Sequence, residues 1–306
     1  MSADSKVVWM DGKLTPFQDA NVHVLSHSLH YGSAAFEGVR AYKTADGRTA
    51  IFRALEHMER FERSSRIFGS SLSYTPAQLV DAMREVVRAN GFDACYLRPL
   101  SYIGNETRGL KLPASPSLKI AIAAWSWGKY LGAEVMQKGI KVCVSSFRRP
   151  DVASGLPWAK LSGNYLNSIM ARREATLAGC DEALLLDQQG YVAEGSGENV
   201  FVVQRGELLT PPPGAILLGI TRDCIFQLAR EAGLTVREAF ITRNQIYDAD
   251  EVFFTGTAAE VTPIAMVDGR LIGSGEPGPV TRKLAETFER CTKGEVAAFR
   301  SWLTYV

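Results

Sequence analysis

The sequence predicts a mixed α/β protein of two domains, with β-sheet prominent in both. Its 306 residues exceed the usual size of a single domain. Short β-like runs alternate with amphipathic helical stretches over the whole length, and the sequence shows neither an internal repeat nor a low-complexity tract. Hydrophobic residues make up 46% of the chain and charged residues 22%, which is the composition of an ordinary globular enzyme.

Charge and cysteine patterns argue against several protein classes. The formal net charge of +1 gives no basic surface for a nucleic acid and no charge for binding a membrane surface. No apolar run approaches the length of a membrane span, and residues 1–5 are too polar for a signal peptide. The five cysteines are scattered and lack any C-x-x-C spacing, as in a reduced protein. We therefore expect a cytoplasmic protein that binds neither nucleic acid nor membrane.

The N-terminal third is expected to combine β-structure with helices. Apolar residues recur on one face of a helical stretch that ends at Gly91, and a second helical stretch ends at Gly69. Asp11-Gly12 is a typical hairpin turn. The predicted elements are a strand at residues 7–10, helices at 55–68 and 76–90, and strands at 95–100 and 118–124.

The alternating pattern breaks over residues 128–138. We place the connection between the domains there, with a small N-terminal domain over residues 1–127 and a large C-terminal domain over residues 139–306. The second domain again mixes both kinds of element. Strands are predicted at 142–144, 183–186, 191–193, 200–203 and 207–209, and helices at 164–178, 221–232 and 280–291.

Lys160 and Glu194 are the residues that say most about function. A lysine can form a Schiff base with a carbonyl cofactor, and a carboxylate in a separate Gly-rich turn can keep the ring nitrogen of that cofactor protonated. Pyridoxal phosphate chemistry needs both groups. Most lysines are solvated surface residues, however, so the pair needs support from the rest of the chain.

The turn that follows Glu194 has two interpretations. Gly195-x-Gly197 could belong to a dinucleotide-binding fingerprint, which requires a third glycine and a following helix. Val200 stands at the third position, and the run after it is β-like. A sharp turn between two strands, with Glu194 exposed at its lip, fits better.

Three segments could hold a phosphate, which needs backbone amides, a cation or both. One is the entry to the helix after Gly219, with Thr221 as the N-cap. Another is the run of small residues 255–259, and the third is Arg60. Taken singly, these are typical of a capped helix, a tight loop and a solvated helix residue.

Taken together, these segments resemble the branched-chain amino acid aminotransferases, which belong to the fold type IV pyridoxal-phosphate enzymes. The resemblance runs from Trp9 to about Gly294 and consists of about ten short motifs in the same order, which is far more specific than any one of them. The motifs are residues 27–32, 36–40, 60, 96–99, 127–130, 159–160, 163–165, the Glu194 turn, 219–221 and 255–260.

The resemblance implies a two-domain fold like that of D-amino acid aminotransferase, with pyridoxal 5'-phosphate in the domain interface. Lys160 would bind the cofactor and move the proton between substrate and cofactor, and Glu194 would pair with the pyridinium nitrogen. Tyr165 would bond the cofactor O3′, and Leu218 would pack on its ring. The phosphate would be held by Arg60, the amides of Ile220 and Thr221, and Thr257.

The resemblance also implies the substrates. The enzyme would move the amino group of L-leucine, L-isoleucine or L-valine to 2-oxoglutarate in a ping-pong cycle, with Arg98 accepting the side-chain carboxylate of glutamate. It would be at least a homodimer, and a hexamer is common in the family. The substrate residues would be Phe36, Gly38, Tyr96, Arg98, Trp127, Tyr130, Thr257 and Ala258, with Tyr31 and Leu110 supplied by a neighbouring subunit.

Several alternatives remain. Within the fold these are D-amino acid aminotransferase, (R)-selective amine transaminase and aminodeoxychorismate lyase, against which Tyr96-x-Arg98 and Trp127-Gly128-x-Tyr130 argue. The pocket aromatics could be core residues, and the protein could be a non-catalytic homologue that binds the cofactor or a partner. Intact Lys160 argues against the last.

Two other features need an interpretation. Arg108 stands where the family has an apolar residue, and it either favours carboxylate-rich substrates or points to solvent and pairs with Glu106. His27 and His30 are three residues apart, but no third ligand is nearby, so structural roles are predicted and no metal site.

Overall fold

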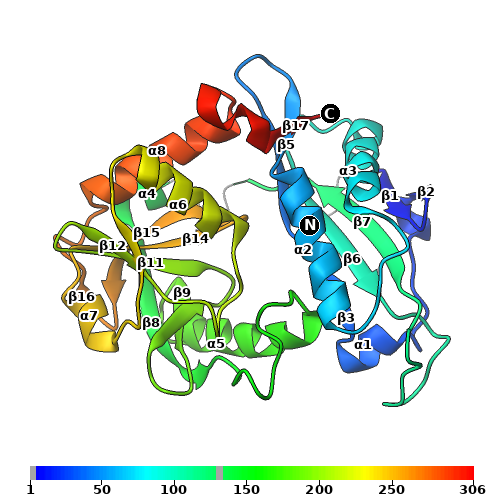
Figure 1. The fold of residues 1–306 in the computed structure, drawn as a ribbon, viewed down its shortest axis with the longest axis horizontal. Helices are drawn as coiled ribbons and strands as arrows, with labels where there is room; N and C mark the ends of the chain where they lie inside the picture. Colours follow the sequence, from blue (N-terminus) through cyan, green and yellow to red (C-terminus); the bar gives the residue numbers. More distant parts are fainter. Residues whose placement is uncertain (1–4, 129–133) are drawn as a thin grey trace. The chain divides into compact units, whose positions relative to one another are not determined.

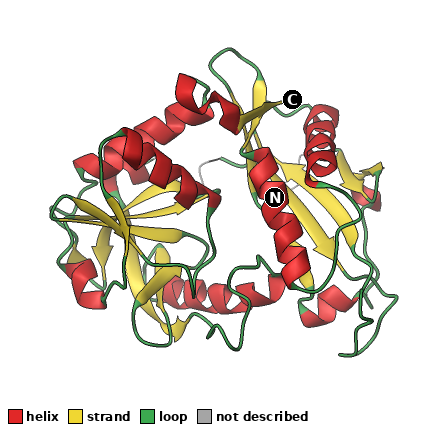
Figure 2. Ribbon diagram, viewed as in Figure 1, coloured by secondary structure: helices red, strands yellow, loops and turns green. Residues whose placement is uncertain are grey.

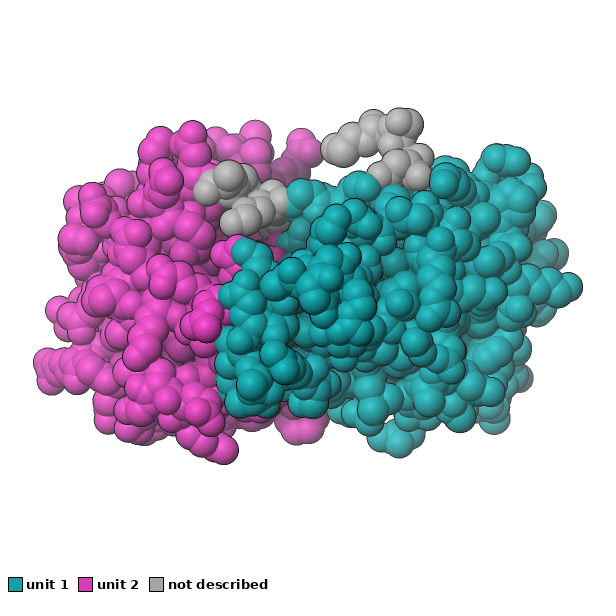
Figure 3. Space-filling view, turned by 90° about the horizontal axis from the view of Figure 1, so that it is seen from above, with its two compact units in different colours: residues 1–128, 159–163, 291–306 teal, residues 129–158, 164–290 magenta. Residues whose placement is uncertain are grey.

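The computed structural model describes residues 5–128 and 134–306, which divide into two compact units (Figure 3). The first unit is built from the described residues within 1–128, 159–163 and 291–306, and the second from those within 129–158 and 164–290. Of the connection predicted at 128–138, residues 129–133 lie outside the described part of the chain. The segment that carries Lys160 belongs to the first unit.

The first unit contains an antiparallel sheet in the order β17-β5-β4-β6-β7-β1-β2, and β3 also pairs with β6 (Figures 1 and 2). Its strands are β1 (Val7–Met10), β2 (Lys13–Pro16), β3 (Ala34–Phe36), β4 (Val39–Lys43), β5 (Thr49–Phe52), β6 (Cys95–Tyr102), β7 (Lys119–Trp125) and β17 (Leu303–Tyr305). Its α-helices are α1 (His27–Tyr31), α2 (Ala54–Ile67) and α3 (Pro76–Asn90). The 3-10 helices Phe17–Asp19 and Ala297–Trp302 also belong to it, as do the first two residues of a third, Ser162–Asn164.

The core of this unit lies between the sheet and the helices α2 and α3. Met58 and Phe61 of α2 and Leu79 and Met83 of α3 have no exposed surface, and they pack in one cluster with alternate residues of β6 and β7. A capping box between Thr75 and the third helical residue starts α3, as such a box commonly does. The predicted hairpin, both helices and both strands of this third are confirmed.

The second unit contains a mixed sheet in the order β10-β9-β8-β15-β14-β11-β12-β13, with β16 paired to β15. Its strands are β8 (Ile140–Arg148), β9 (Glu182–Leu186), β10 (Val192–Gly195), β11 (Asn199–Gln204), β12 (Glu207–Thr210), β13 (Val236–Glu238), β14 (Glu251–Gly256), β15 (Glu260–Val267) and β16 (Arg270–Leu271). Its helices are α4 (Val135–Lys138), α5 (Tyr165–Leu177), α6 (Ile220–Glu231), α7 (Arg243–Tyr247) and most of α8 (Pro279–Thr292).

Small residues bring α5 close to its sheet. Ala171 and Ala175 are fully buried and pack with Ala183 and Leu185 of β9. The centre of the sheet is apolar, and Phe201 of β11 stacks on its cross-strand partner in β14 with ring centroids 5.3 Å apart. The strands and helices predicted for this half are confirmed, with ends that differ by a few residues. The predicted mixture of α- and β-structure, with a sheet in each half, is also confirmed.

Candidate active site

Lys160 is held by backbone contacts with two elements of the first unit. Its carbonyl oxygen accepts a hydrogen bond from the Phe36 amide at 3.0 Å, and its own amide donates to Ser64 Oγ at 3.0 Å. Ala35 of β3 forms a bridge with Leu161. The lysine backbone is therefore fixed against β3 and α2, and Nζ lies 4.9 Å from the centre of the Phe36 ring. A positioned amine is what a covalent cofactor needs.

Arg60 is buried on the face of α2 that also carries His57 and Ser64, because residues three and four apart share a helix face. Its Nε donates to Glu37 Oε1 at 2.7 Å and its Nη2 to Glu37 Oε2 at 2.8 Å. His57 Nδ1 lies 2.8 Å from the same Oε2. The interpretation of Arg60 as a solvated helix residue is thus excluded.

The charges in this group are set by burial and pairing. Burial alone would raise the pKa of Glu37, but the Arg60 guanidinium and the hydrogen bond from His57 hold that pKa well below its usual range. Burial lowers the pKa of His57 despite its carboxylate partner. We infer an ionised Glu37, a cationic Arg60 and a neutral His57 near pH 7.

Arg98 lies in an aromatic setting on β6. Its guanidinium carbon is 4.9 Å from the centre of the Phe36 ring, 5.3 Å from that of Tyr96 and 5.7 Å from that of Trp125. Nη2 donates to the Tyr96 hydroxyl at 3.2 Å. Tyr96 and Arg98 are two residues apart, so their side chains share one face of the strand. A cation held over ring faces is suited to bind a carboxylate.

The neighbours of Tyr96 explain two further predicted residues. A Cβ atom at Gly38 would overlap the Tyr96 hydroxyl, so only glycine fits there. The Trp127 ring stands edge-on to Tyr96 with centroids 4.6 Å apart. Arg40, which the sequence did not single out, anchors the Trp127 carbonyl oxygen through Nη2 at 2.9 Å and that of Gly128 at 3.1 Å.

The remaining predicted residues of the first unit lie at its surface or outside the described part. Tyr31 is 50% exposed and Leu110 is 83% exposed. Arg108 is also exposed, as expected if it points to solvent, and the carboxylate of Glu106 pairs with Lys119 at 2.7 Å. Tyr130 lies outside the described residues.

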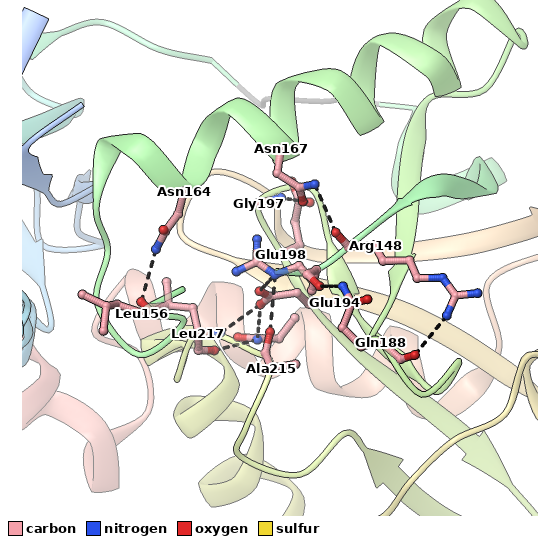
Figure 4. A network of polar contacts seen from close by, with 12 residues as sticks. Arg148, Leu156, Asn164, Asn167, Gln188, Glu194, Gly197, Glu198, Ala215 and Leu217 are labelled. Atoms are coloured by element: carbon pink, nitrogen blue, oxygen red, sulfur yellow. Dashed lines mark hydrogen bonds and ion pairs between the residues drawn. The ribbon is translucent and has the colours of Figure 1, made fainter. Parts of the chain in front are cut away.

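In the second unit, Glu194 is buried in a network of donors (Figure 4). Arg149 Nε lies 2.9 Å from its Oε1, while Oε2 accepts from the Leu217 amide at 3.1 Å and from Asn199 Nδ2 at 3.2 Å. The predicted turn between two strands is present, because β10 ends at Gly195 and β11 begins at Asn199. The predicted exposure of Glu194 is wrong, since the side chain points into the unit, toward Arg149.

Sequence reasoning missed three members of this network. Two of them contact Glu194: Arg149 directly follows β8, and Asn199 is the first residue of β11. Of these two, only Asn199 is close in sequence to a matched motif. The third is Glu198, whose Oε2 accepts from the Gly197 amide at 2.9 Å. Burial and the nearby Glu182 raise the pKa of Glu198 to about 8, so its carboxyl is mostly protonated at neutral pH.

The N-terminus of α6 has the donor set of a phosphate site. Within the described residues no side chain caps this helix, and Ile220 and Thr221 in its first turn are buried. Gly219 is the N-cap, with φ −71° and ψ 138°, so the prediction of Thr221 as the N-cap is wrong. A Cβ atom at Gly219 would clash with Asn199 Oδ1. Thr255 Oγ1 is buried without a partner in the described part of the chain, and these features fit a bound anion.

The other predicted residues of the second unit are half-buried. Tyr165 is the first residue of α5. Leu218 directly precedes the cap of α6, and Thr257 and Ala258 lie in the turn between β14 and β15. The structure thus groups Arg60, Lys160 and the aromatic residues in the first unit, and Glu194, Tyr165, Leu218 and the anion donors in the second.

A positioned lysine, a buried carboxylate and a set of anion donors are the groups that a pyridoxal-phosphate enzyme requires. Residues 34–267 match the model of the amino-transferase class IV family, which is more than half of the chain. The chain therefore belongs to the class IV aminotransferases, and the family predicted from its motifs is confirmed.

Relatives and solved structures agree with this assignment. The branched-chain-amino-acid aminotransferase of Pseudomonas aeruginosa is 48% identical over 300 residues, which cover 98% of this chain and 97% of that protein. The enzyme of Escherichia coli K12 is 43% identical with the same coverage. The crystal structure of the T.th. branched-chain amino acid aminotransferase with pyridoxamine 5'-phosphate matches with a TM-score of 0.95, at 46% identity and with 98% of both chains covered. The predicted fold type is confirmed.

Proposed function

We propose that this protein is a pyridoxal-phosphate-dependent aminotransferase that moves the amino group of L-leucine, L-isoleucine or L-valine to 2-oxoglutarate. The observation that carries the proposal is similarity over 98% of the chain to branched-chain-amino-acid aminotransferases. The hydrogen bonds that fix the Lys160 backbone and the donors around Glu194 support the proposal. The positioned Lys160 also argues against a non-catalytic homologue.

The cofactor is assigned to the residues that the family motifs imply. Bound pyridoxal phosphate supplies an electron sink that stabilises negative charge on the substrate Cα. Lys160 Nζ binds the cofactor covalently and carries the proton to and from Cα. Glu194, kept in place by Arg149 and Asn199, holds a proton on the ring nitrogen. Tyr165 donates to the ring hydroxyl oxygen, and Leu218 packs against the ring.

The phosphate is assigned to one cation and several neutral donors. Arg60 contributes charge and hydrogen bonds, and its place on α2 is set by Glu37. The amides of Ile220 and Thr221 contribute the uncapped donors of α6, where the helix dipole also favours an anion. The hydroxyl of Thr257 completes the set.

Substrate selection is assigned to the substrate residues that the family motifs imply. Phe36 and Trp127 bury an aliphatic side chain, and Gly38, which has no Cβ atom, lets the Tyr96 hydroxyl lie directly against the backbone. Arg98 pairs with the side-chain carboxylate of glutamate, while Tyr96 and the amide of Ala258 orient the α-carboxylate. Apolar burial discriminates only modestly between side chains that differ by a methylene, so all three branched substrates are accepted.

A homo-oligomer, at least a dimer, is supported by apolar residues that α5 exposes to solvent. The helix packs its small residues against the sheet, and its large ones face outward. The exposed residues are Leu166, Ile169, Met170 and Leu177. A second apolar group covers residues 22–31 and includes Tyr31. Patches of this kind mark protein interfaces, and Tyr31 and Leu110 are assigned to the site of the neighbouring subunit.

A reducing compartment, the cytoplasm, is proposed from the cysteines, because all five are thiols and none is joined in a disulfide within the described residues. In the described part of the chain, no helix combines the length and the apolar character that crossing a membrane requires.

The experiment that tests the proposed function is a titration of the cofactor-loaded protein with L-leucine, followed by visible absorbance. The band of the lysine-bound cofactor is expected to disappear with leucine and to return on addition of 2-oxoglutarate, because the two half-reactions exchange the amino group. A band that persists through leucine would overturn the substrate. Conversion by D-alanine or an (R)-amine instead would identify one of the alternatives within the fold.

A further inference from the structure

We propose that Glu37 is a positioning residue which presents Arg60 to the phosphate of the cofactor and thereby sets the preference of this protein for pyridoxal phosphate over unphosphorylated pyridoxal. This inference rests on the proposed role of Arg60 in holding the phosphate. Glu37 itself touches neither substrate nor cofactor in this assignment.

The position of Glu37 is determined by the sheet. It directly follows β3, and its amide donates to the carbonyl oxygen of Pro99 on β6 at 2.8 Å. Its side chain has no exposed surface. A carboxylate in such a place requires several donors, since an unpaired buried charge costs far more than a paired one. The donors are Arg60 and His57 on α2 and the amide of Gly38 at 3.2 Å.

The geometry of the pair restricts the arginine. Nε and Nη2 lie on one edge of the planar guanidinium, and Glu37 engages both with separate oxygens. Two parallel hydrogen bonds fix the plane and the direction of the guanidinium group. They therefore also fix the direction of Nη1, which lies at its opposite edge. Arginine otherwise loses rotamer freedom on binding, and a pre-ordered side chain avoids this cost.

The same segment links the pair to the lysine. Phe36, the residue before Glu37, donates from its amide to the carbonyl oxygen of Lys160, and Ser64 on the Arg60 face of α2 accepts from the Lys160 amide. Two consecutive residues at the end of β3 therefore set the place of the covalent anchor, through Phe36, and of the cation, through Glu37. Phosphate recognition and amine position are built on the same backbone.

The negative charge of Glu37 has an effect on phosphate affinity that is opposite to the effect of positioning. Glu37 is an anion, and an anion near a phosphate repels it, so its removal would raise phosphate affinity if charge alone mattered. If positioning dominates, its removal lowers phosphate affinity although the local charge becomes more positive. The direction of the change therefore distinguishes the two effects.

The test compares the dissociation constants of pyridoxal phosphate and pyridoxal, measured by absorbance on the full-length protein freed of cofactor. Both aldehydes reach Lys160, and only one carries the phosphate. The preference for pyridoxal phosphate is the ratio of the dissociation constant of pyridoxal to that of pyridoxal phosphate. In Glu37→Gln this ratio is expected to fall by about tenfold to a hundredfold, which is the usual contribution of charge-assisted hydrogen bonds. The affinity for pyridoxal itself is expected to change little. An unchanged or increased ratio would overturn the inference.

Two further variants keep the result interpretable. Glu37→Asp retains the charge but moves the carboxylate away from the guanidinium. If Glu37 acts by positioning Arg60, the ratio is reduced in this variant. If it acts by charge alone, the ratio is unchanged. Glu251→Gln is the matched control, because Glu251 is a buried carboxylate that accepts from Thr281 at the start of α8. It is expected to lower stability without altering the ratio.

Arg60→Met separates this inference from the role on which it rests. If Arg60→Met leaves the ratio unchanged, the phosphate assignment of Arg60 fails. If Arg60→Met lowers the ratio and both Glu37 variants do not, the phosphate role stands and the positioning role of Glu37 fails.

Discussion

At the residue scale, function depends on charges that are buried and paired. Glu194 has a cation and two neutral donors around it, and Glu37 has Arg60 and His57. Glu198 lies near a second carboxyl group, that of Glu182, and holds a proton instead, since burial and the neighbouring charge favour the neutral form. Carboxyl groups of one residue type thus have different protonation states because their surroundings differ.

Glu194→Gln is expected to bind the cofactor and to lose most of its turnover. A neutral amide no longer holds the proton on the ring nitrogen, and misplacing a proton by about two pKa units costs roughly 2.7 kcal/mol, about a hundredfold in rate. The measurement is single-turnover conversion of L-leucine together with the absorbance of bound cofactor. Near-normal turnover would disprove the assignment.

Glu198→Gln is expected to change how stability depends on pH. The pKa of Glu198 is about 8 in the folded protein against 4.5 for an ordinary glutamate, so the native state binds more protons than the unfolded state between these values. Stability from this group is therefore present below about pH 4.5 and is lost as the pH rises toward about pH 8. Glutamine resembles the protonated carboxyl group and does not titrate, so the variant should not lose this stability as the pH rises. Melting temperatures of the cofactor-free protein between about pH 5 and about pH 8.5 test it.

Glu276→Gln, a substitution of an exposed glutamate, is the control for this experiment. Its melting temperature should follow the parent protein over the same range. If Glu198→Gln also follows the parent, Glu198 does not titrate as proposed.

At the element scale, helix faces and helix ends bring the functional groups together. The spacing of His57, Arg60 and Ser64 places three polar side chains on one side of α2. At the start of α6 the absence of a side-chain cap, among the described residues, leaves first-turn amides for an anion. Gly219 is required there by the close approach of Asn199.

Gly219→Ala is expected to destabilise the cofactor-free protein and to weaken cofactor binding. The added methyl group displaces Asn199, which bonds both Glu194 and the Leu217 carbonyl oxygen. Overpacking of this kind costs about 1–3 kcal/mol. Urea unfolding and absorbance titration with pyridoxal phosphate measure the two effects. Gly197→Ala is the control for stability, because a Cβ atom there meets no described atom within 4 Å.

At the scale of the whole molecule, each unit has its own sheet and its own apolar core. The chain returns to the first unit at residues 159–163 and again at its C-terminal end. This return is why the lysine belongs to the unit that holds Arg60, although the sequence places it after the predicted connection. The division into domains at residues 128–138 itself stays a prediction.

Ile169→Glu is expected to reduce the size of the oligomer. The side chain is 61% exposed in the single chain and lies in the apolar stripe of α5, where a buried charge would oppose association. Light scattering after size-exclusion chromatography measures the mass. Ala89→Glu on the exposed side of α3 is the matched control and should keep the parent mass. An unchanged mass for Ile169→Glu would place the interface elsewhere.

The elements follow from local sequence, whereas most of the proposed site residues come from the family resemblance. The limits of α3 agree with the residues at its ends, with Pro76 as the first helical residue and Gly91 as the C-cap, because helix ends depend on neighbouring residues. Lys160 and Glu194 stood out by residue type and motif. Glu37 lay inside a matched motif, but its partner Arg60 is on another element, so nothing in the sequence alone singled it out.

What only the tertiary structure decided is which distant groups meet and which are buried. Arg149, which directly follows β8, and Asn199, the first residue of β11, both contact Glu194, and these contacts reverse the exposure expected for that carboxylate. The raised pKa of Glu198 depends likewise on Glu182 and on burial. Periodicity and turn residues encode local conformation, whereas solvation and pairing of a charge depend on every element that packs around it.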